Sequence, residues 1–409
     1  MPEEKLKIIR DAPTRYHFKT KDDQRVSIEY RDKGLAVGLH KWDEEASFEM
    51  DLNIVKSSKH QFVGNKVEID TPAQKLRVYP IDIRSTGEFY GDIEDVVQCE
   101  DGGLRFELVL KAKPLTNSFA IPIKSKNLRF SKQPFLTLED IDAGTSCPLN
   151  VEGSYAVYHA TKKNNQYMTG KAFHIYRPIA EDALGNKAWC AIHIDGYIDP
   201  KNLTITIPQQ FLDEATYPVS IDPDFGFTTI GASAVPIAEG ELDNIRRGSA
   251  WAMPETSTAN YIRAYIGGDA VCDCKAFINQ KDSGGANTHG QIATKENLSC
   301  ATAYHWEEFT LGEEALTEAV VYILNIMGNK DDIPKKEEYR IKYDVNGALA
   351  VASYSVAAIY DPASDPWMDL PDETTRDFSI YCNYGVEAPA ALENKSANMG
   401  SKMVAAGLI

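Results

Sequence analysis

Three histidines on successive apolar runs are the residues of this chain whose types and spacing could do chemistry. His159, His174 and His193 stand in GSYAVYHA, GKAFHIYRP and AWCAIHIDG. Neutral imidazoles are frequent metal ligands, so three of them on neighbouring strands could meet at one ion. That requires a shared face and a matched register, whereas a histidine held by ordinary hydrogen bonds requires neither. The simpler interpretation predicts no metal ion and no cofactor.

Two further groups carry reactive side chains. Cys272 and Cys274 form a C-x-C pair with no second pair at zinc-finger spacing, which favours packed thiols in a strand. His305, Glu307 and Glu308 in HWEEF lack the H-E-x-x-H spacing of a zinc peptidase. The chain also has no G-x-S-x-G, P-loop or G-x-G-x-x-G sequence. We therefore predict no catalytic residue and a protein that is not an enzyme.

The elements that would position these residues are β-strands almost throughout. Short runs rich in Val, Ile, Phe and Tyr alternate with turn signals, and residues 4–110 hold no clean helical period. The run at 317–328, TEAVVYILNIMG, lacks either period, and its β-branched content favours a buried strand. Trp306 and Phe309 are expected to point inward together. The predicted fold class is all-β, with tandem antiparallel β-sandwich domains, a C-terminal jelly-roll-like sandwich and a short C-terminal tail.

Length and turn signals predict several domains. The expected divisions are an N-terminal β domain at 1–110, a second β region at 111–235 that could form one unit with the first, an acidic jelly-roll-like sandwich at 236–386 and a tail at 387–409.

The junction stretch is FLDEATYPVSIDPDFGFTTIG, residues 211–231. Tyr217, Val219 and Ile221 alternate with polar residues or proline, so we expect all three to be buried on one face of a strand. Pro218 and Pro223 cannot donate to a ladder, which indicates an edge strand or a strand-to-linker transition.

The formal net charge is distributed unevenly along the chain. Residues 1–235 carry 29 Lys or Arg and 34 Asp or Glu, a formal −5, while residues 236–409 carry 14 and 26, a formal −12. An acidic surface disfavours binding to nucleic acid. No apolar stretch is long enough to insert into a membrane, and the acidic start is unlike a signal peptide. Seven scattered cysteines in a large chain favour reduced thiols.

A series of motifs occupies the middle of the chain: KPLTNSFAIPI and LRFSKQPFLT are followed in order by GSYAVYH, YMTGKAFHIYRP, LTITIPQQFLD and YPVSIDPDFGFTTIG, together covering residues 108–231. In this combination the motifs resemble a family of β-rich proteins encoded by tailed bacteriophages. The resemblance implies a non-enzymatic virion component in head decoration, fibre or tail, assembled in the host cytoplasm with other virion proteins. It supplies no catalytic residue.

Assembly and adhesion are the modes of action that we expect. The apolar end of the tail, with Met403, Val404, Leu408 and Ile409, is the predicted assembly contact and favours a homo-oligomer. Trp367, in the loop DPASDPWMDLPD, is the predicted contact to a host-surface glycan. The alternative function is a glycan-cleaving enzyme or carbohydrate-binding module that uses the C-terminal sandwich, with a carboxylate pair in a groove for cleavage.

Overall fold

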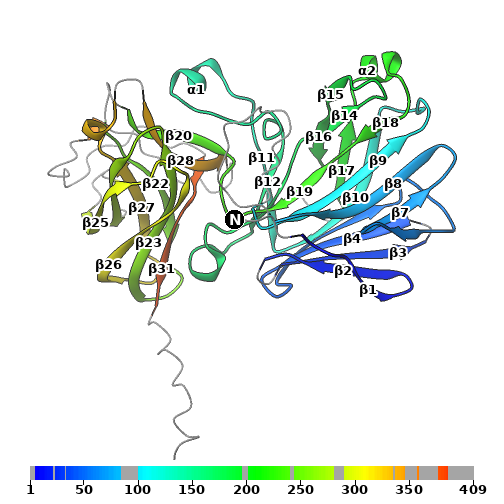
Figure 1. The fold of residues 1–409 in the computed structure, drawn as a ribbon. Helices are drawn as coiled ribbons and strands as arrows, with labels where there is room; N and C mark the ends of the chain where they lie inside the picture. The colour runs from blue at the N-terminus through cyan, green and yellow to red at the C-terminus, as the bar shows by residue number, and fades with distance from the viewer. Residues whose placement is uncertain are drawn as a thin grey trace, which may run out of the picture.

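The chain folds into two β-sandwiches that lie side by side (Figure 1), and the predicted all-β class is confirmed. This computed structural model describes residues 5–21, 24–32, 34–83, 100–195, 201–239, 244–280, 290–334, 337–345, 357–358 and 376–385. Trp367 and the predicted tail contacts Met403, Val404, Leu408 and Ile409 lie outside these residues.

One layer of the first sandwich is an antiparallel sheet of eight described strands. Its order is β1 (Ile9–Ala12), β2 (Arg15–Lys19), β3 (Arg25–Arg31), β4 (Gly34–Lys41), β5 (Ala46–Leu52), β10 (Ser118–Lys126), β17 (Lys201–Thr206) and β16 (Ala191–Ile194).

The other layer of the first sandwich contains eleven described strands. They are β6 (Gln61–Val63), β7 (Lys66–Asp70), β8 (Gln74–Ile81), β9 (Gly103–Leu110), β11 (Leu128–Lys132), β12 (Tyr155–His159), β13 (Lys171–Ile175), β14 (Ile179–Glu181), β15 (Lys187–Trp189), β18 (Val219–Ile221) and β19 (Asp224–Phe227).

Several chain segments pass from one layer to the other, and in two of them a single residue separates the two strands. β10 continues into β11 through Asn127, whose φ of 55° is tolerated by asparagine. β15 continues into β16 through the buried Cys190. A single apolar core runs from Leu6 to Phe227, so the segments 1–110 and 111–235 contribute strands to the same two sheets and side chains to the same core.

The junction stretch lies inside the second layer and not at its edge. β18 and β19 follow β9 in one register, with Ile221 opposite Leu108 and Asp224 opposite Arg105. On their other side, β18 pairs with β14 and β19 with β13. Of the two predicted alternatives, an edge strand or a strand-to-linker transition, the edge strand is therefore wrong. Pro223 falls between two short strands, where its missing donor interrupts the ladder locally.

The burial expected for this stretch is confirmed at two of three positions. Val219 and Ile221 lie in the core of the first sandwich. Tyr217 is only half-buried, because it precedes β18 and its hydroxyl donates to the Leu212 carbonyl at 3.0 Å. A tyrosine can pack its ring against apolar side chains while its hydroxyl stays near solvent, so Tyr217 does not need to be fully buried.

The second sandwich has its own core, which runs from Val235 to Tyr384. One layer holds β20 (Ser233–Glu239), β21 (Asn244–Ile245), β23 (Ser257–Gly268), β26 (His305–Leu316), β28 (Glu338–Val345), β29 (Ala357–Ala358), β30 (Arg376–Phe378) and β31 (Ile380–Tyr384). The other holds β22 (Arg247–Ala252), β24 (Cys272–Gln280), β25 (Gly290–Cys300) and β27 (Val321–Gly328).

Two predictions in the second sandwich have opposite outcomes. The ambiguous run at 317–328 contains the buried strand β27, as predicted. Phe309 is fully buried in the core, but the inward orientation of Trp306 is wrong. Trp306 is the register partner of Tyr265, whereas Phe309 is the partner of the core residue Ile262, so the two side chains leave opposite faces of the sheet.

Helices are short and peripheral. Those in the described residues are α1 (Leu138–Asp142), α2 (Gln209–Glu214) and the 3₁₀ turns η1 (Asn165–Tyr167) and η2 (Lys330–Asp332). A capping box starts α1: Thr137 accepts from the Asp140 amide, and the Asp140 carboxylate accepts in return. No residue of α1 is buried, and it projects above the junction of the sandwiches (Figure 1). No described helix is long and apolar enough to cross a membrane.

Candidate functional site

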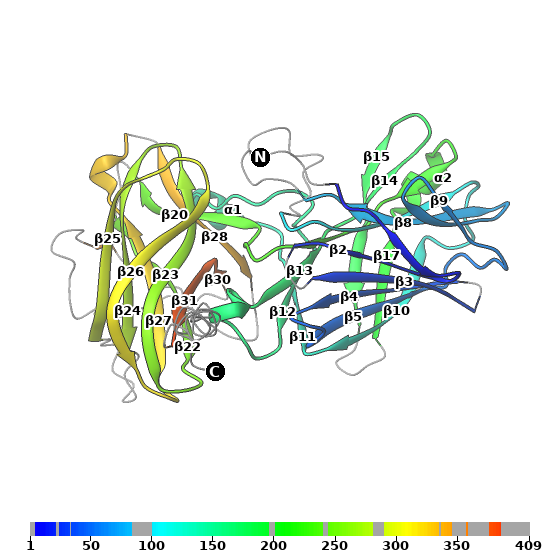
Figure 2. The same ribbon diagram turned by 60° about the horizontal axis from the view of Figure 1, so that its bottom comes forward.

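A buried ion pair joins the two sandwiches. Lys171 opens β13 in the first sandwich, and its Nζ lies 2.7 Å from Oδ2 of Asp344 in β28 of the second. Their side chains are 1% and 0% exposed. Figure 2 shows β11, β12 and β13 on the side of the first sandwich that is nearest the second. Charged side chains are rarely buried without a partner, so this pair marks the centre of the contact.

A β-bulge directs Lys171 toward the second sandwich. Val157 is opposite Phe173, but the next pair is Tyr158 with Lys171, so Ala172 is an extra residue in β13. Without the extra residue, Lys171 would share the core-facing side of Phe173. The bulge places it beside Tyr158 on the outer face, an example of an irregularity that re-aims a side chain.

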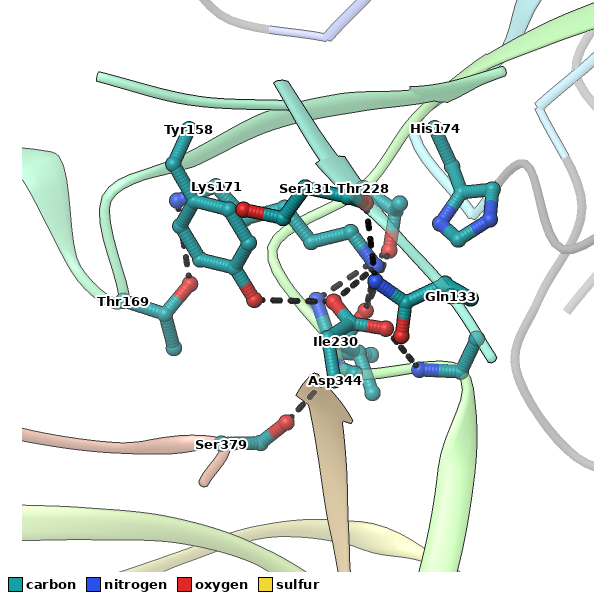
Figure 3. Close-up of polar contacts among 12 residues, drawn as sticks. Ser131, Gln133, Tyr158, Thr169, Lys171, His174, Thr228, Ile230, Asp344 and Ser379 are labelled. Carbon is teal, nitrogen blue, oxygen red and sulfur yellow. Dashed lines mark hydrogen bonds and ion pairs between the residues drawn. The ribbon is translucent and has the colours of Figure 1, made fainter. Parts of the chain in front are cut away.

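Three donors surround the Asp344 carboxylate (Figure 3). Oδ2 accepts from Lys171 Nζ and from the Tyr158 hydroxyl at 2.8 Å, and Oδ1 accepts from the Ala232 amide at 2.9 Å. Burial alone would raise the pKa of Asp344, but the neighbouring Lys171 ammonium and these hydrogen bonds hold it below the usual value. Burial, followed by the nearby Asp344 charge, raises the pKa of Tyr158, which therefore remains a donor.

The segment that connects the sandwiches is fastened to the same cluster. Lys171 Nζ donates to the Ile230 carbonyl at 2.7 Å, and the Thr169 hydroxyl donates to the Thr229 carbonyl at 2.7 Å. The Gly231 amide donates to Ser379 Oγ at 2.7 Å. A Cβ on Gly231 would lie 2.3 Å from the Tyr343 carbonyl carbon, so only glycine allows this close approach.

Amide side chains of the first sandwich complete the ladders of the second. Gln133 donates to the Val345 carbonyl at 2.9 Å and accepts from the Val345 amide at 2.8 Å. Asn164 and Asn165 accept from the backbone amides of Cys382 and Tyr384, each at 2.9 Å. Side chains that satisfy strand amides in this way cover an edge that would otherwise offer unpaired groups. The contact is therefore directional and polar.

The three histidines that could in principle have met at one metal ion, His159, His174 and His193, do not converge. His174 Nε2 lies 2.6 Å from Ser154 Oγ, whereas His159 Nδ1 accepts from the amides of Thr161 and Lys162. His193 lies on β16, in the other layer. Within the described part of the chain, no group of three His, Cys, Asp or Glu residues could hold a metal ion.

The Ser154 and His174 pair is enclosed. Both side chains belong to residues that are 0% exposed, and burial, with the nearby Lys171 charge, lowers the pKa of His174 to about 3. His174 Nδ1 has no hydrogen-bond partner in the described residues. A neutral imidazole beside a hydroxyl could in principle activate a nucleophile, but enclosure keeps this pair from meeting a substrate.

The other reactive groups have structural partners. Cys272 is the register partner of Cys300, and burial, with these two neighbouring thiols, raises the pKa of Cys274. Thiols held protonated in this way are poor nucleophiles. His305 Nε2 lies 2.6 Å from Glu307 in HWEEF.

An aromatic row on the outer face of the second sandwich was not predicted. The Tyr265 ring lies 6.1 Å from that of Tyr304 and 5.4 Å from that of Trp306, which in turn lies 5.2 Å from Tyr381, centroid to centroid. Tyr304 and Trp306 are half-buried, while Tyr265 and Tyr381 are buried. Half-exposed rings can bind apolar faces of a ligand.

The buried junction cluster was also missed by sequence reasoning. A local signal exists on one side of the pair, where Lys171 is the one lysine or carboxylate residue in the buried strand KAFHI, whereas Asp344 stands among other charged residues in EYRIKYDV. Their partnership spans two domains and depends on a bulge, which alternation cannot reveal.

Comparison of the chain with protein-family models, curated proteins and solved structures found no match.

Proposed function

We propose that this protein is a non-enzymatic structural component of a tailed-phage virion, in head decoration, fibre or tail. The observation that carries the proposal is the buried polar junction, which holds two β-sandwiches in one relative orientation. A rigid two-domain unit is suited to a virion component that must hold neighbouring proteins at fixed relative positions. The phage-like motifs at 108–231 support the same role, since they include β13 and the connecting segment.

Exposed apolar side chains near α1 support an assembly role. Phe135, Leu138 and Ile141 are 59%, 81% and 54% exposed along one connecting segment. Apolar groups gathered in this way are typical of protein–protein contacts. We propose that this segment and the tail residues Met403, Val404, Leu408 and Ile409 contact other virion proteins or a second copy of the chain.

Mass spectrometry of purified virions tests the role. We expect the protein in the particle, with hundreds of copies for head decoration and a few to some tens for tail or fibre. Absence from the virion would refute the proposal. Deletion of residues 397–409 and the change Leu138→Glu should each weaken assembly, measured by analytical ultracentrifugation, while Leu184→Glu is a control at another exposed leucine.

The aromatic row favours a second candidate function, binding of a host-surface glycan by the second sandwich. Trp306 and Tyr304 offer half-exposed rings, and the ion pair of Arg263 with Glu308, 2.6 Å apart, supplies polar groups on the same sheet. Trp306→Ala should abolish retention on a glycan array, with Trp42→Phe in the other sandwich as control. Turnover of the bound glycan would instead indicate a glycan-cleaving enzyme.

A further inference from the structure

We propose that Lys171 and Asp344 condense into an intramolecular isopeptide bond that links the two sandwiches covalently. The Lys171 ammonium and the Asp344 carboxylate would become one amide and one water molecule. The reaction exchanges no electrons and requires no cofactor. This inference concerns the junction itself and stands whether or not the protein is found in virions.

The reacting groups are already placed for attack. Lys171 Nζ is 2.7 Å from Asp344 Oδ2 and is held from a second direction by the Ile230 carbonyl, also at 2.7 Å. The bulge in β13 and the ladder of β28 position the two side chains. Fixing two reactants in this way is worth an effective concentration on the order of 10⁵–10⁸ M in well-oriented systems.

The contacts of Asp344 match the needs of the reaction. Nζ first passes one proton to Oδ2, the neutral amine then attacks Cγ, and the negative charge that develops on Oδ1 is met by the Ala232 amide, 2.9 Å away. Oδ2 leaves as water after taking two protons that originate on the ammonium, while the third stays on the new amide nitrogen. The Tyr158 hydroxyl, 2.8 Å from Oδ2, donates to that oxygen as it leaves and recovers a proton from the nitrogen.

Burial favours the product over the ion pair. Both charges have been removed from water, which costs several kcal/mol per ion before their attraction is counted. Condensation replaces them with a neutral amide, and the water molecule can leave for bulk solvent. Condensation to the amide therefore becomes favourable at a buried site, because the ammonium and the carboxylate have already lost their hydration there.

A second buried carboxyl group, that of Glu100, interacts electrostatically with this pair. Glu100 Oε2 is buried with no hydrogen-bond partner in the described residues, and its charge interacts with that of Lys171. Burial raises the pKa of Glu100, although a hydrogen bond from Thr228 opposes the rise. A carboxyl that is easily protonated can store and return the protons that move between Nζ and Oδ2.

The intact mass of the full-length protein tests the proposal. We expect a mass that is lower than the sequence mass by one water molecule, and a branched peptide joining Lys171 to Asp344 after proteolysis. Lys171→Arg keeps the positive charge but should retain the full sequence mass. Glu100→Gln should slow the mass loss in freshly made protein.

The intact mass of the wild-type protein tests for the isopeptide bond even if a variant fails to fold. A folded wild-type protein that keeps its full sequence mass after prolonged incubation would overturn the proposal. A water loss that maps to residues other than Lys171 and Asp344 would overturn it as well.

Discussion

The interiors of the two sandwiches and the junction between them are built on different principles. The sandwich interiors are apolar, with rings such as Phe48, Phe106 and Phe225 in contact and fully buried. Among the described residues, the junction holds a small apolar cluster of Val151, Tyr176 and Ala232, together with hydrogen bonds and an ion pair. Apolar packing supplies stability without direction, whereas polar contacts fix one geometry. Orientation therefore depends on the junction residues, whereas the junction pair and the apolar cores both contribute to stability.

The strongest test of this contrast is Lys171→Met. It leaves the Asp344 carboxylate buried without its counter-ion, and we expect a loss of about 3–5 kcal/mol in the free energy of unfolding. Urea denaturation measures the loss. Arg15→Met is the matched control, because Arg15 is 67% exposed in its pair with Glu29 and should cost less than about 1 kcal/mol. Equal losses in the two variants would contradict the inference that the buried ion pair at the junction contributes more to stability than an exposed ion pair.

Phe48→Ala should separate stability from orientation. Phe48 is fully buried against Phe130, Phe173 and Phe225, so its truncation should cost about 3–5 kcal/mol. Small-angle X-ray scattering of the folded variant should nevertheless match the wild type, whereas Lys171→Met should broaden the distance distribution. A Phe48→Ala profile that shows separated domains would break the proposed division of roles.

Gln133→Ala should have a smaller and more local effect. It removes both hydrogen bonds to Val345, and an unsatisfied buried backbone group costs about 1–3 kcal/mol. Hydrogen exchange should quicken at the Val345 amide. Gln209→Ala, an exposed glutamine that bonds only to Asp213, is the control and should change exchange at no junction amide.

Acid should weaken the protein through His174. Its folded-state pKa of about 3 is below the unfolded value of about 6.5, so between these values the unfolded chain binds a proton that the folded chain excludes. The contribution of neutral His174 is complete above pH 6.5 and is lost as the pH falls, by about 1.4 kcal/mol per pH unit. The difference in unfolding free energy between wild type and His174→Gln should shrink accordingly; a constant difference from pH 7 to 4 would exclude this origin.

The sequence predicts well what depends on local alternation. Alternation predicts Val219 and Ile221 on a buried face, β-branched content predicts the buried strand β27, and both predictions are confirmed; the Gly-Asn turn in DALGNK is likewise typical of the hairpin that joins β14 to β15. Each of these depends on a period of two or on turn chemistry within a few residues.

What depends on contacts between distant segments was not predictable. The prolines near β18 indicated an edge, but β14 lies beyond that strand because of tertiary pairing. The inward prediction for Trp306 is wrong for a local reason instead: Trp306 and Phe309 are three residues apart in a regular part of β26, so alternation itself places their side chains on opposite faces. The partnership of Lys171 with Asp344 requires a bulge in one domain and a strand in another, so neither residue indicates its partner.

The chain order of the ion pair has a consequence during synthesis. At about 5–20 residues per second, Asp344 follows Lys171 by roughly 10–35 s, and the first sandwich can fold within that interval. Its outer face, with Tyr158, Lys171 and Gln133, must then wait uncovered beside the growing chain. Hydrogen-bonding groups can be hydrated during this wait, whereas an apolar face of the same extent would attract other nascent chains. A polar junction thus keeps a half-made molecule soluble.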